Sequence, residues 1–238
     1  METEEKERIL QSAKTWFRNS IATNHKRNSE KLADPQAFNI NPFLVNYLAN
    51  FLTGDNSPES IAKALIYPRV LGTSITTSFG TNMQRFASEV LSGFGSMVPG
   101  IDIEFEDQVD GRHKYCQLKA GPNTINNDDV ETISGHFRSA KNLAQTNNLT
   151  IGYGDLIIGV LYGTLEDLNG NYRRLTSAYD YPVLVGNDFW TRLTGDTDFF
   201  EDLIDTIASV ALEIDGTETM QNIVAQLASS DEIKKLAS

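Results

Sequence analysis

Cysteine and histidine are scarce in this chain of 238 residues, which has one cysteine, Cys116, and three histidines. A single cysteine cannot form an internal disulfide, and His136 has no second histidine or cysteine at zinc-ligand spacing. The sequence contains no run of 18 apolar residues, so we expect no membrane-spanning helix. The charged start, residues 1–8, is unlike a signal peptide. We therefore expect a protein of a reducing cytoplasm.

Basic side chains are outnumbered as well, with 20 Lys and Arg against 32 Asp and Glu and a formal net charge of −12. Proteins that coat nucleic acid without sequence preference are usually basic, so this class is disfavoured. The acidity is uneven, because residues 1–174 carry 17 basic and 20 acidic side chains whereas residues 175–238 carry 3 and 12. A local basic cleft therefore remains compatible with the negative total.

Three common motifs are missing: the G-x-x-x-x-G-K-[ST] phosphate loop, the G-x-G-x-x-G fingerprint and the G-x-S-x-G nucleophile elbow. The chain instead alternates between segments of helical and of strand periodicity. We expect helices over 4–24, 42–52, 81–91 and 127–145, strands over 154–163 and 181–186, and helices that begin near 188 and 197. We expect loops over 24–28 and 71–80, and a hairpin turn at Asn169-Gly170.

These elements predict an α/β fold in which a mixed sheet is flanked by helices. Residues 1–66 are mostly helical, and we expect them to form a helical N-terminal region before a core domain of residues 67–238. Such a region could form a dimer interface, embrace DNA as an arm, or cap the core.

The most informative segments are residues 101–105 and 115–120, which both alternate with a period of two and therefore predict half-buried strands. Asp110-Gly111 between them predicts a hairpin turn. Alternation places Asp102 and Glu104 opposite the apolar side chains of the first strand, and Gln117 and Lys119 opposite those of the second. If the apolar faces coincide, these four polar side chains converge. Carboxylates, an amide oxygen and an ammonium group suit a divalent metal ion and a phosphate.

Pro99-Gly100-Ile101-Asp102 and Gln117-Leu118-Lys119 resemble the motif of the PD-(D/E)xK nuclease superfamily. The longer segments Gly100–Phe105 and Gln117–Asn126 are similar to those of type II restriction endonucleases. The proline is displaced here, and glutamine stands where the superfamily usually has an acid. The resemblance covers roughly residues 80–205, and it implies a Mg²⁺-dependent enzyme from the cytoplasm of a bacterium or archaeon that acts on double-stranded DNA.

The resemblance also implies roles for individual side chains. Asp102 would bind the metal ion, Gln117 would lend its side-chain oxygen, and Lys119 would position the attacking water. Because Gln117 lacks a charge, a further acid is expected to help hold the metal ion. Glu89, on the helix before the first strand, and Glu104 are the candidates, although Glu89 could equally be an exposed helical side chain.

Contacts with DNA are expected after the second strand, on the outward face of the following helix and at the Asn169-Gly170 hairpin. The candidates are Asn123, Thr124, Asn126, His136, Arg138, Lys141, Arg173 and Arg174. Solvated surface positions are the alternative for the charged members of this set.

The leading hypothesis is a type II restriction endonuclease that hydrolyses phosphodiester bonds at a specific short duplex site. A palindromic site needs two active sites related by a two-fold axis, so a homodimer is expected. The uncharged Gln117 leaves a second hypothesis open, that of a catalytically inactive DNA-binding protein on the same fold. A repair or structure-specific nuclease of the same superfamily is the third hypothesis.

Overall fold

The computed structural model describes residues 2–152 and 154–237. Its internal contacts divide the chain into two compact units, which are described one at a time. Unit 1 consists of Met1–Trp16 and Gly80–Ser209, and unit 2 consists of Phe17–Phe79 and Val210–Ser238. The expected division between residues 66 and 67 differs from this one, because both ends of the chain pack against segments that are distant in sequence.

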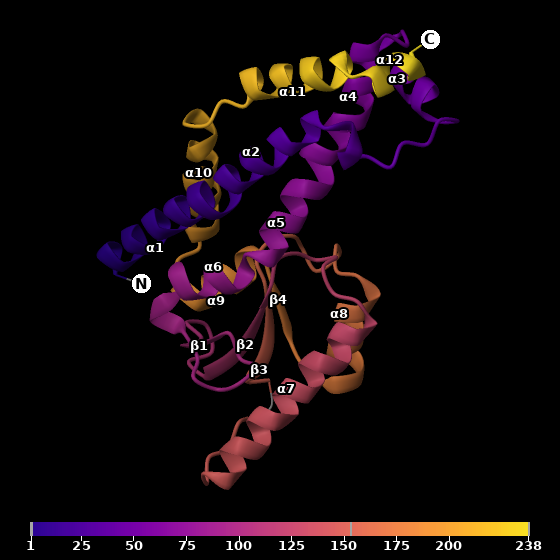
Figure 1. Cartoon of the computed structure of the whole chain (residues 1–238). Coiled ribbons are helices and arrows are strands. Elements are labelled where there is room, and N and C mark those ends of the chain that lie inside the picture. Colours follow the sequence, from indigo (N-terminus) through magenta and orange to yellow (C-terminus); the bar gives the residue numbers. More distant parts are fainter. Residues whose placement is uncertain (1, 153, 238) are drawn as a thin grey trace. The chain divides into compact units, whose positions relative to one another are not determined.

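A four-stranded mixed sheet lies at the centre of unit 1 (Figure 1). Its order is β1-β2-β3-β4, with β1 antiparallel to β2 and the other neighbouring pairs parallel. The strands are β1 (Ile103–Glu106), β2 (His113–Lys119), β3 (Leu156–Val160) and β4 (Val183–Val185). The sheet and its flanking helices confirm the predicted α/β class.

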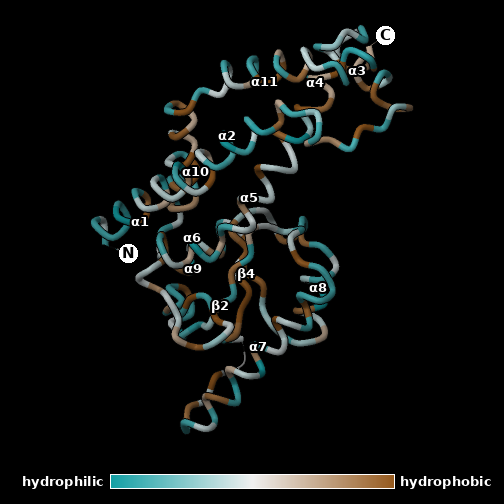
Figure 2. The backbone as a smooth tube through the Cα atoms, viewed as in Figure 1, coloured by the Kyte–Doolittle hydropathy of each residue, from teal (hydrophilic) through white to brown (hydrophobic). Residues whose placement is uncertain are grey.

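The parallel pairs are joined by crossover helices, as parallel strands require. Helix α7 (Asn127–Thr146) connects β2 to β3, and α8 (Gly170–Tyr179) lies between β3 and β4. Apolar side chains of both helices pack with one face of the sheet in a single cluster that includes Phe137, Tyr172 and Ile158. Hydrophobic residues run along the central strands, whereas α7 alternates between hydrophobic and hydrophilic residues (Figure 2). This pattern is that of a buried sheet covered by amphipathic helices.

Aromatic side chains gather on the opposite face of the sheet. The ring of Trp190 lies edge-on to that of Phe86 at 6.2 Å, and Phe189 lies edge-on to Phe105 at 6.4 Å. A Cβ atom at Gly159 would lie 2.6 Å from the Phe189 ring, so the close packing on β3 requires glycine. The helices of this region are α1 (Thr3–Trp16), α6 (Met83–Glu89), α9 (Asn187–Thr194) and α10 (Phe199–Ala208).

Helix α1 belongs to unit 1 although it begins the chain. Lys6 Nζ lies 2.5 Å from Asp202 Oδ2 on α10, and the Trp16 ring lies 4.9 Å from the Phe86 ring. These contacts explain why the N-terminal residues do not form one region with residues 17–66.

Unit 2 is helical throughout its regular structure. Its principal helices are α2 (Thr23–Glu30), α3 (Val45–Thr53), α4 (Pro58–Pro68), α11 (Thr217–Ser229) and α12 (Asp231–Leu236). Ile61 and Ile66 of α4 share a buried cluster with Ile223 and Leu227 of α11. The C-terminal segment therefore completes the core of the helical region, which local sequence patterns do not reveal.

Three local predictions are wrong. Residues 24–28 lie inside α2, and residues 71–80 are helical, in a π-helical segment (Arg69–Ser74) and α5 (Ile75–Thr81). Asn169-Gly170 begins α8, because the Asn169 side chain accepts hydrogen bonds from the N–H groups of Asn171 and Tyr172 at 3.0 and 3.3 Å. Asparagine is a good helix N-cap as well as a turn residue, and here the cap prevails.

Candidate active site

Asp102 lies one residue before β1 and is fixed to β2 through both its backbone and its side chain. Its N–H donates to the carbonyl of Cys116 at 3.0 Å, and its Oδ2 accepts from the N–H of Leu118 at 2.7 Å. Ile103 pairs with Cys116, so continuing this antiparallel register by one residue places Asp102 opposite Gln117. Opposite residues share a face of the sheet, so the strands bring these two polar side chains together as predicted.

Burial makes the Asp102 carboxylate costly to keep charged. Its pKa is raised above the usual value by desolvation, although the N–H of Leu118 and the charge of Lys119 oppose the shift. Among the described residues, Oδ1 of Asp102 has no hydrogen-bond partner. A desolvated carboxylate with a free oxygen gains more from a neighbouring cation than an exposed one does.

Lys119 ends β2 on the same side and is half-buried. Its ammonium group makes no hydrogen bond or ion pair with any residue that the structure describes. Lys114, on the same strand, is in the opposite situation: its Nζ lies 2.7 Å from Asp110 and 3.6 Å from Asp155. The ammonium group of Lys119, which lies near the half-buried Asp102 carboxylate without pairing with it, is therefore available to a ligand.

Gln117 is buried, with 5% of its surface exposed. Its neighbours determine which way round the side-chain amide lies. Nε2 contacts the carbonyl oxygen of Gly100 and lies 2.7 Å from Nδ1 of His136. The amide nitrogen carries two hydrogens and no lone pair, so both contacts use it as the donor and Nδ1 of His136 accepts. Rotating the amide by half a turn would set Oε1 against the Gly100 carbonyl. The oxygen of Gln117 is thus directed away from both partners.

Gly100 makes this contact with His136 possible. Its φ is +81°, in the left-handed region, and a Cβ atom there would lie 2.5 Å from the His136 ring. Only glycine combines this backbone conformation with such a close approach. His136 was predicted on the outward face of its helix, and that placement is wrong, since α7 turns the ring toward the sheet. The glycine after Pro99 was the one signal in the sequence for this approach.

The two additional acids lie in other environments. Glu104 accepts a hydrogen bond from Ser96 Oγ, and its Oε2 lies 3.0 Å from His113 Nε2. Glu89, on α6, forms an ion pair with Arg85 at 2.9 Å on the exposed side of the helix. Their participation in metal binding remains a prediction.

The donor set at Asp102 fits Mg²⁺ in one mode of binding. Across residues 2–152 and 154–237 no group of three or more His, Cys, Asp or Glu side chains could enclose a metal ion. Mg²⁺ however often binds through one or two carboxylates, and waters and substrate phosphates complete its octahedron. The free oxygen of Asp102 and the amide oxygen of Gln117 suit that mode.

The predicted DNA contacts divide into accessible and engaged side chains. Asn123 and Arg138 are exposed, and neither has a hydrogen-bond partner among the described residues. Thr124 is exposed as a residue, but its hydroxyl donates to the Gly121 carbonyl at 2.8 Å. Asn126 caps α7 in a capping box with Asp129. Its carbonyl oxygen is therefore used within the fold.

The basic candidates on the crossover helices also have internal partners. Arg174 reaches from α8 to Asn127 at 2.6 Å and to Glu131 at 3.0 Å, and Arg173 donates to the Glu166 carbonyl at 3.3 Å. Lys141 stands over the Tyr181 ring at 5.8 Å. Both arginines lie on a helix and not on the predicted hairpin, so their approach to DNA differs from the expected one.

A buried ionic network, which we did not predict, lies at the other end of β2. Asp107, 1% exposed, accepts from Arg192 at 2.9 Å, and Lys114, 3% exposed, pairs with Asp110 and Asp155. The Asp110-Gly111 turn was predicted correctly, with Gly111 at φ +69°. The network ties the turn to β3 and α9, so it supports the sheet at the end remote from Asp102.

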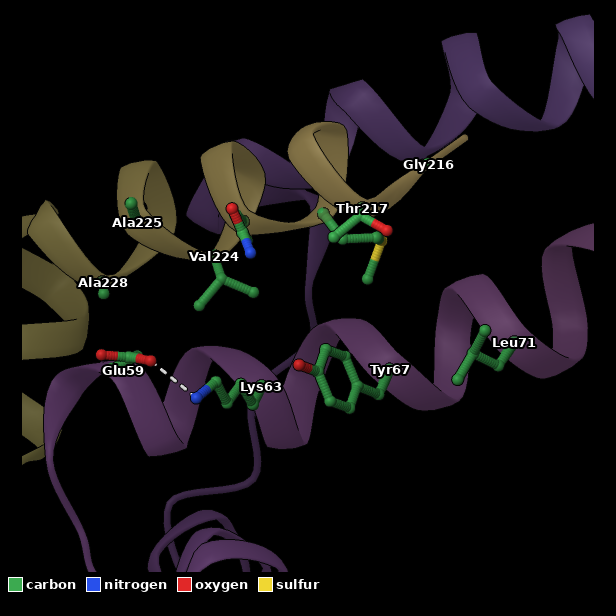
Figure 3. A pocket seen from close by; sticks show the side chains of 11 residues that line it. Glu59, Lys63, Tyr67, Leu71, Gly216, Thr217, Val224, Ala225 and Ala228 are labelled. Atoms are coloured by element: carbon green, nitrogen blue, oxygen red, sulfur yellow. Dashed lines mark ion pairs between the residues drawn. The ribbon is translucent and has the colours of Figure 1, made fainter. Parts of the chain in front are cut away.

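A cavity in unit 2, between α4 and α11, has a volume of about 700 Å³ (Figure 3). Its lining is mostly apolar, and the charges of Glu59 and Lys63 neutralise each other at 2.6 Å. Such a lining offers no free carboxylate for a metal ion. Asp102, Gln117 and Lys119 remain the candidate catalytic residues.

Comparison with known proteins identifies the family. The family model of the type II restriction endonuclease EcoO109I matches residues 12–215, which include the whole sheet and the candidate site. No curated protein matches the chain. None of the helices in the described parts of the chain is both long and apolar enough to span a membrane. Because the match extends over most of the sequence, this chain belongs to the EcoO109I family of type II restriction endonucleases.

Proposed function

We propose that the protein is a Mg²⁺-dependent endonuclease that hydrolyses phosphodiester bonds at a specific short site in double-stranded DNA. The observation that carries this proposal is the free ammonium group of Lys119 beside the desolvated carboxylate of Asp102. The family supports a nuclease acting on DNA. The proposed site is a variant of the PD-(D/E)xK motif in which Gln117 stands in place of the acid.

Each residue has a defined task in this proposal. Asp102 would hold the metal ion, because the N–H of Leu118 occupies only Oδ2 of its carboxylate. Mg²⁺ held there would supply positive charge that stabilises the negative charge developing on the scissile phosphate. Lys119 donates hydrogen bonds to the attacking water and to a non-bridging phosphate oxygen, so its charge offsets the negative charge that develops there.

The hydrolysis balances without a covalent enzyme intermediate. The oxygen of the attacking water forms a bond to phosphorus as the bond to the leaving oxygen breaks. The leaving oxygen takes a proton from solvent, and the attacking water loses one to solvent. Lys119 stays charged throughout.

We also propose that His136 and Gly100 position Gln117. Their acceptor atoms hold the amide nitrogen, so Oε1 is the amide atom that would be left for a metal ion. A neutral oxygen binds Mg²⁺ less strongly than a carboxylate does, so Glu104 or Glu89 is expected to contribute a further charge. Glu104 would first have to exchange its contacts with Ser96 and His113.

DNA would be bound beside this site by Asn123 and Arg138, whose side chains are free among the described residues. The other predicted DNA contacts involve side chains that already have partners within the chain. To contact DNA, each must either bind it as an additional partner or release its present one. These side chains are Thr124, Asn126, His136, Lys141, Arg173 and Arg174. We propose that the enzyme acts as a homodimer, since cleavage of both strands at a palindromic site needs two copies of the active site.

The second candidate function, an inactive DNA-binding protein, is favoured by the uncharged Gln117. Incubating the protein with plasmid DNA and Mg²⁺ separates the candidates. Discrete fragments support the restriction endonuclease, and a smear supports a nuclease without site specificity. No cleavage by the natural sequence together with cleavage by a Gln117→Glu variant would support the inactive protein.

A further inference from the structure

Six large hydrophobic side chains are exposed along α3 and the turn before it. Three are aromatic: Phe43 is 90% exposed, Tyr47 64% and Phe51 78%. The other three, which are 46–51% exposed, are Leu44, Leu48 and Leu52. We call these six side chains the α3 stripe. Among the described residues they make up six of the fifteen exposed large hydrophobic side chains, although they span only ten positions.

The α3 stripe is one continuous surface. Its members recur at intervals of three and four residues, which places them on one side of a helix. The rings of Tyr47 and Phe51 are 5.9 Å apart. Val45 and Ala49 lie on an adjoining side and are buried in the core of unit 2. The apolar surface of α3 is therefore wider than the part that unit 2 covers.

The stripe lies in an uncharged stretch of an acidic protein. Residues 35–54 contain no Asp, Glu, Lys or Arg, although the chain has a net charge of −12. Monomeric proteins rarely expose an apolar patch of this extent, because a patch this large favours association. A binding partner that is recognised through its charge would need charged side chains on the α3 stripe. A second copy of an acidic chain needs a contact surface without them, because like charges would repel.

We propose that the α3 stripe is the surface through which two copies of this chain associate, with α3 of one copy packed on α3 of the other about a two-fold axis. In a two-fold interface of this kind, the same surface of each copy contacts its counterpart on the other copy. The three rings alone would bury about 450 Å² per copy, or about 900 Å² in the pair, at their present exposures. Stable interfaces bury about 1,200–2,000 Å². The three leucines and the flanking residues supply the difference.

The α3 stripe would be the contact surface of the proposed homodimer. This inference rests on the proposed function only in one respect, that cleavage of both strands needs two active sites. Its test requires neither DNA nor Mg²⁺. The mass of the full chain is measured by light scattering and sedimentation over a range of micromolar concentrations. We expect the natural sequence to have twice the mass of one chain.

Charge introduced into the stripe should separate the copies. We expect Tyr47→Lys and Phe51→Lys each to raise the dissociation constant of the dimer at least about 100-fold, since the new charge meets its own copy across the axis. Both side chains are mostly exposed, so circular dichroism should be unchanged. Leu149→Lys is the matched control: this leucine is 62% exposed in unit 1, and the variant should remain a dimer.

Disulfide trapping provides a second readout. Cys116 is fully buried, so a cysteine placed in the stripe is the accessible thiol of the chain. Oxidation should link Tyr47→Cys or Phe51→Cys into covalent dimers, whereas Leu149→Cys should form no covalent dimer.

The outcomes separate the interface from the nuclease. A natural sequence that is monomeric at all concentrations overturns the inference, as does a dimer that both lysine variants leave intact. A stripe that binds a different protein or a lipid surface while the chain stays monomeric overturns it as well. A dimer without nuclease activity would refute the proposed function and leave this interface standing.

Discussion

Two lysines five positions apart on β2 should respond to the same substitution in opposite ways. Lys119→Met removes a charge that has no partner among the described residues. We expect the free energy of unfolding to change by less than about 1 kcal/mol, because no ion pair is broken. We expect the rate of cleavage to fall about 100- to 1,000-fold, the loss that follows removal of one donor from a developing oxyanion.

Lys114→Met is the matched comparison. Lys114 is 3% exposed, and its loss leaves Asp110 and Asp155 without a buried cation, although Arg112 and Arg192 remain nearby. Removing one partner of a buried ion pair typically costs about 3–5 kcal/mol. We therefore expect a large loss of stability, with residual cleavage by the fraction that stays folded.

The assay combines first-order cleavage of supercoiled plasmid at saturating Mg²⁺ with guanidinium unfolding followed by circular dichroism. The reasoning is refuted if Lys119→Met keeps more than about one tenth of the rate, since that loss would be below the expected range. It is also refuted if this variant unfolds as readily as Lys114→Met. The first result would remove Lys119 from the reaction, and the second would place its role in the fold.

Three further predictions concern the same end of the sheet. Asp102→Ala should abolish cleavage and weaken Mg²⁺ binding in a calorimetric titration while the circular dichroism spectrum is retained; near-normal cleavage would remove Asp102 from the site. Gly100→Ala should reduce both stability and cleavage, because its left-handed strain of about 1–2 kcal/mol adds to the overlap with the His136 ring; Gly111→Ala, which has a similar φ but open space, should show the strain alone and keep its activity. Chelation of Mg²⁺ with EDTA should stop cleavage and leave the unfolding midpoint unchanged, since no described cluster of side chains encloses a structural ion; a lower midpoint would indicate a metal ion that stabilises the fold.

Local patterns were sufficient where a few neighbouring residues determine the structure. The alternation in 101–105 and 115–120 predicted β1 and β2, and Asp110-Gly111 predicted the turn between them. The helix predicted over 127–145 is α7, and Asn126 directly before it forms the capping box. In each case the deciding interaction spans no more than a few residues, so the sequence contains it directly.

Other features depend on contacts between distant residues and could not be predicted from local patterns. Residues 24–28 are polar, but the helices around them continue through this segment. The ionic network needs the register of β2 on β3 before Lys114 and Asp155 can be seen as neighbours. His136 joins the site only because α7 brings its ring against Gly100, in the turn before β1. Tertiary packing overrides local preference in all three cases.

The hydrogen bond from the Leu118 amide to Asp102 also has a spectroscopic use. This backbone proton is shared with a side-chain carboxylate, so its chemical shift and its exchange with deuterated solvent depend on the charge state of that carboxylate. A cation arriving at Oδ1 would withdraw electron density from Oδ2 and weaken the bond. One resonance in an isotope-labelled sample would thus report occupancy of the site directly, in the absence of DNA and of any turnover.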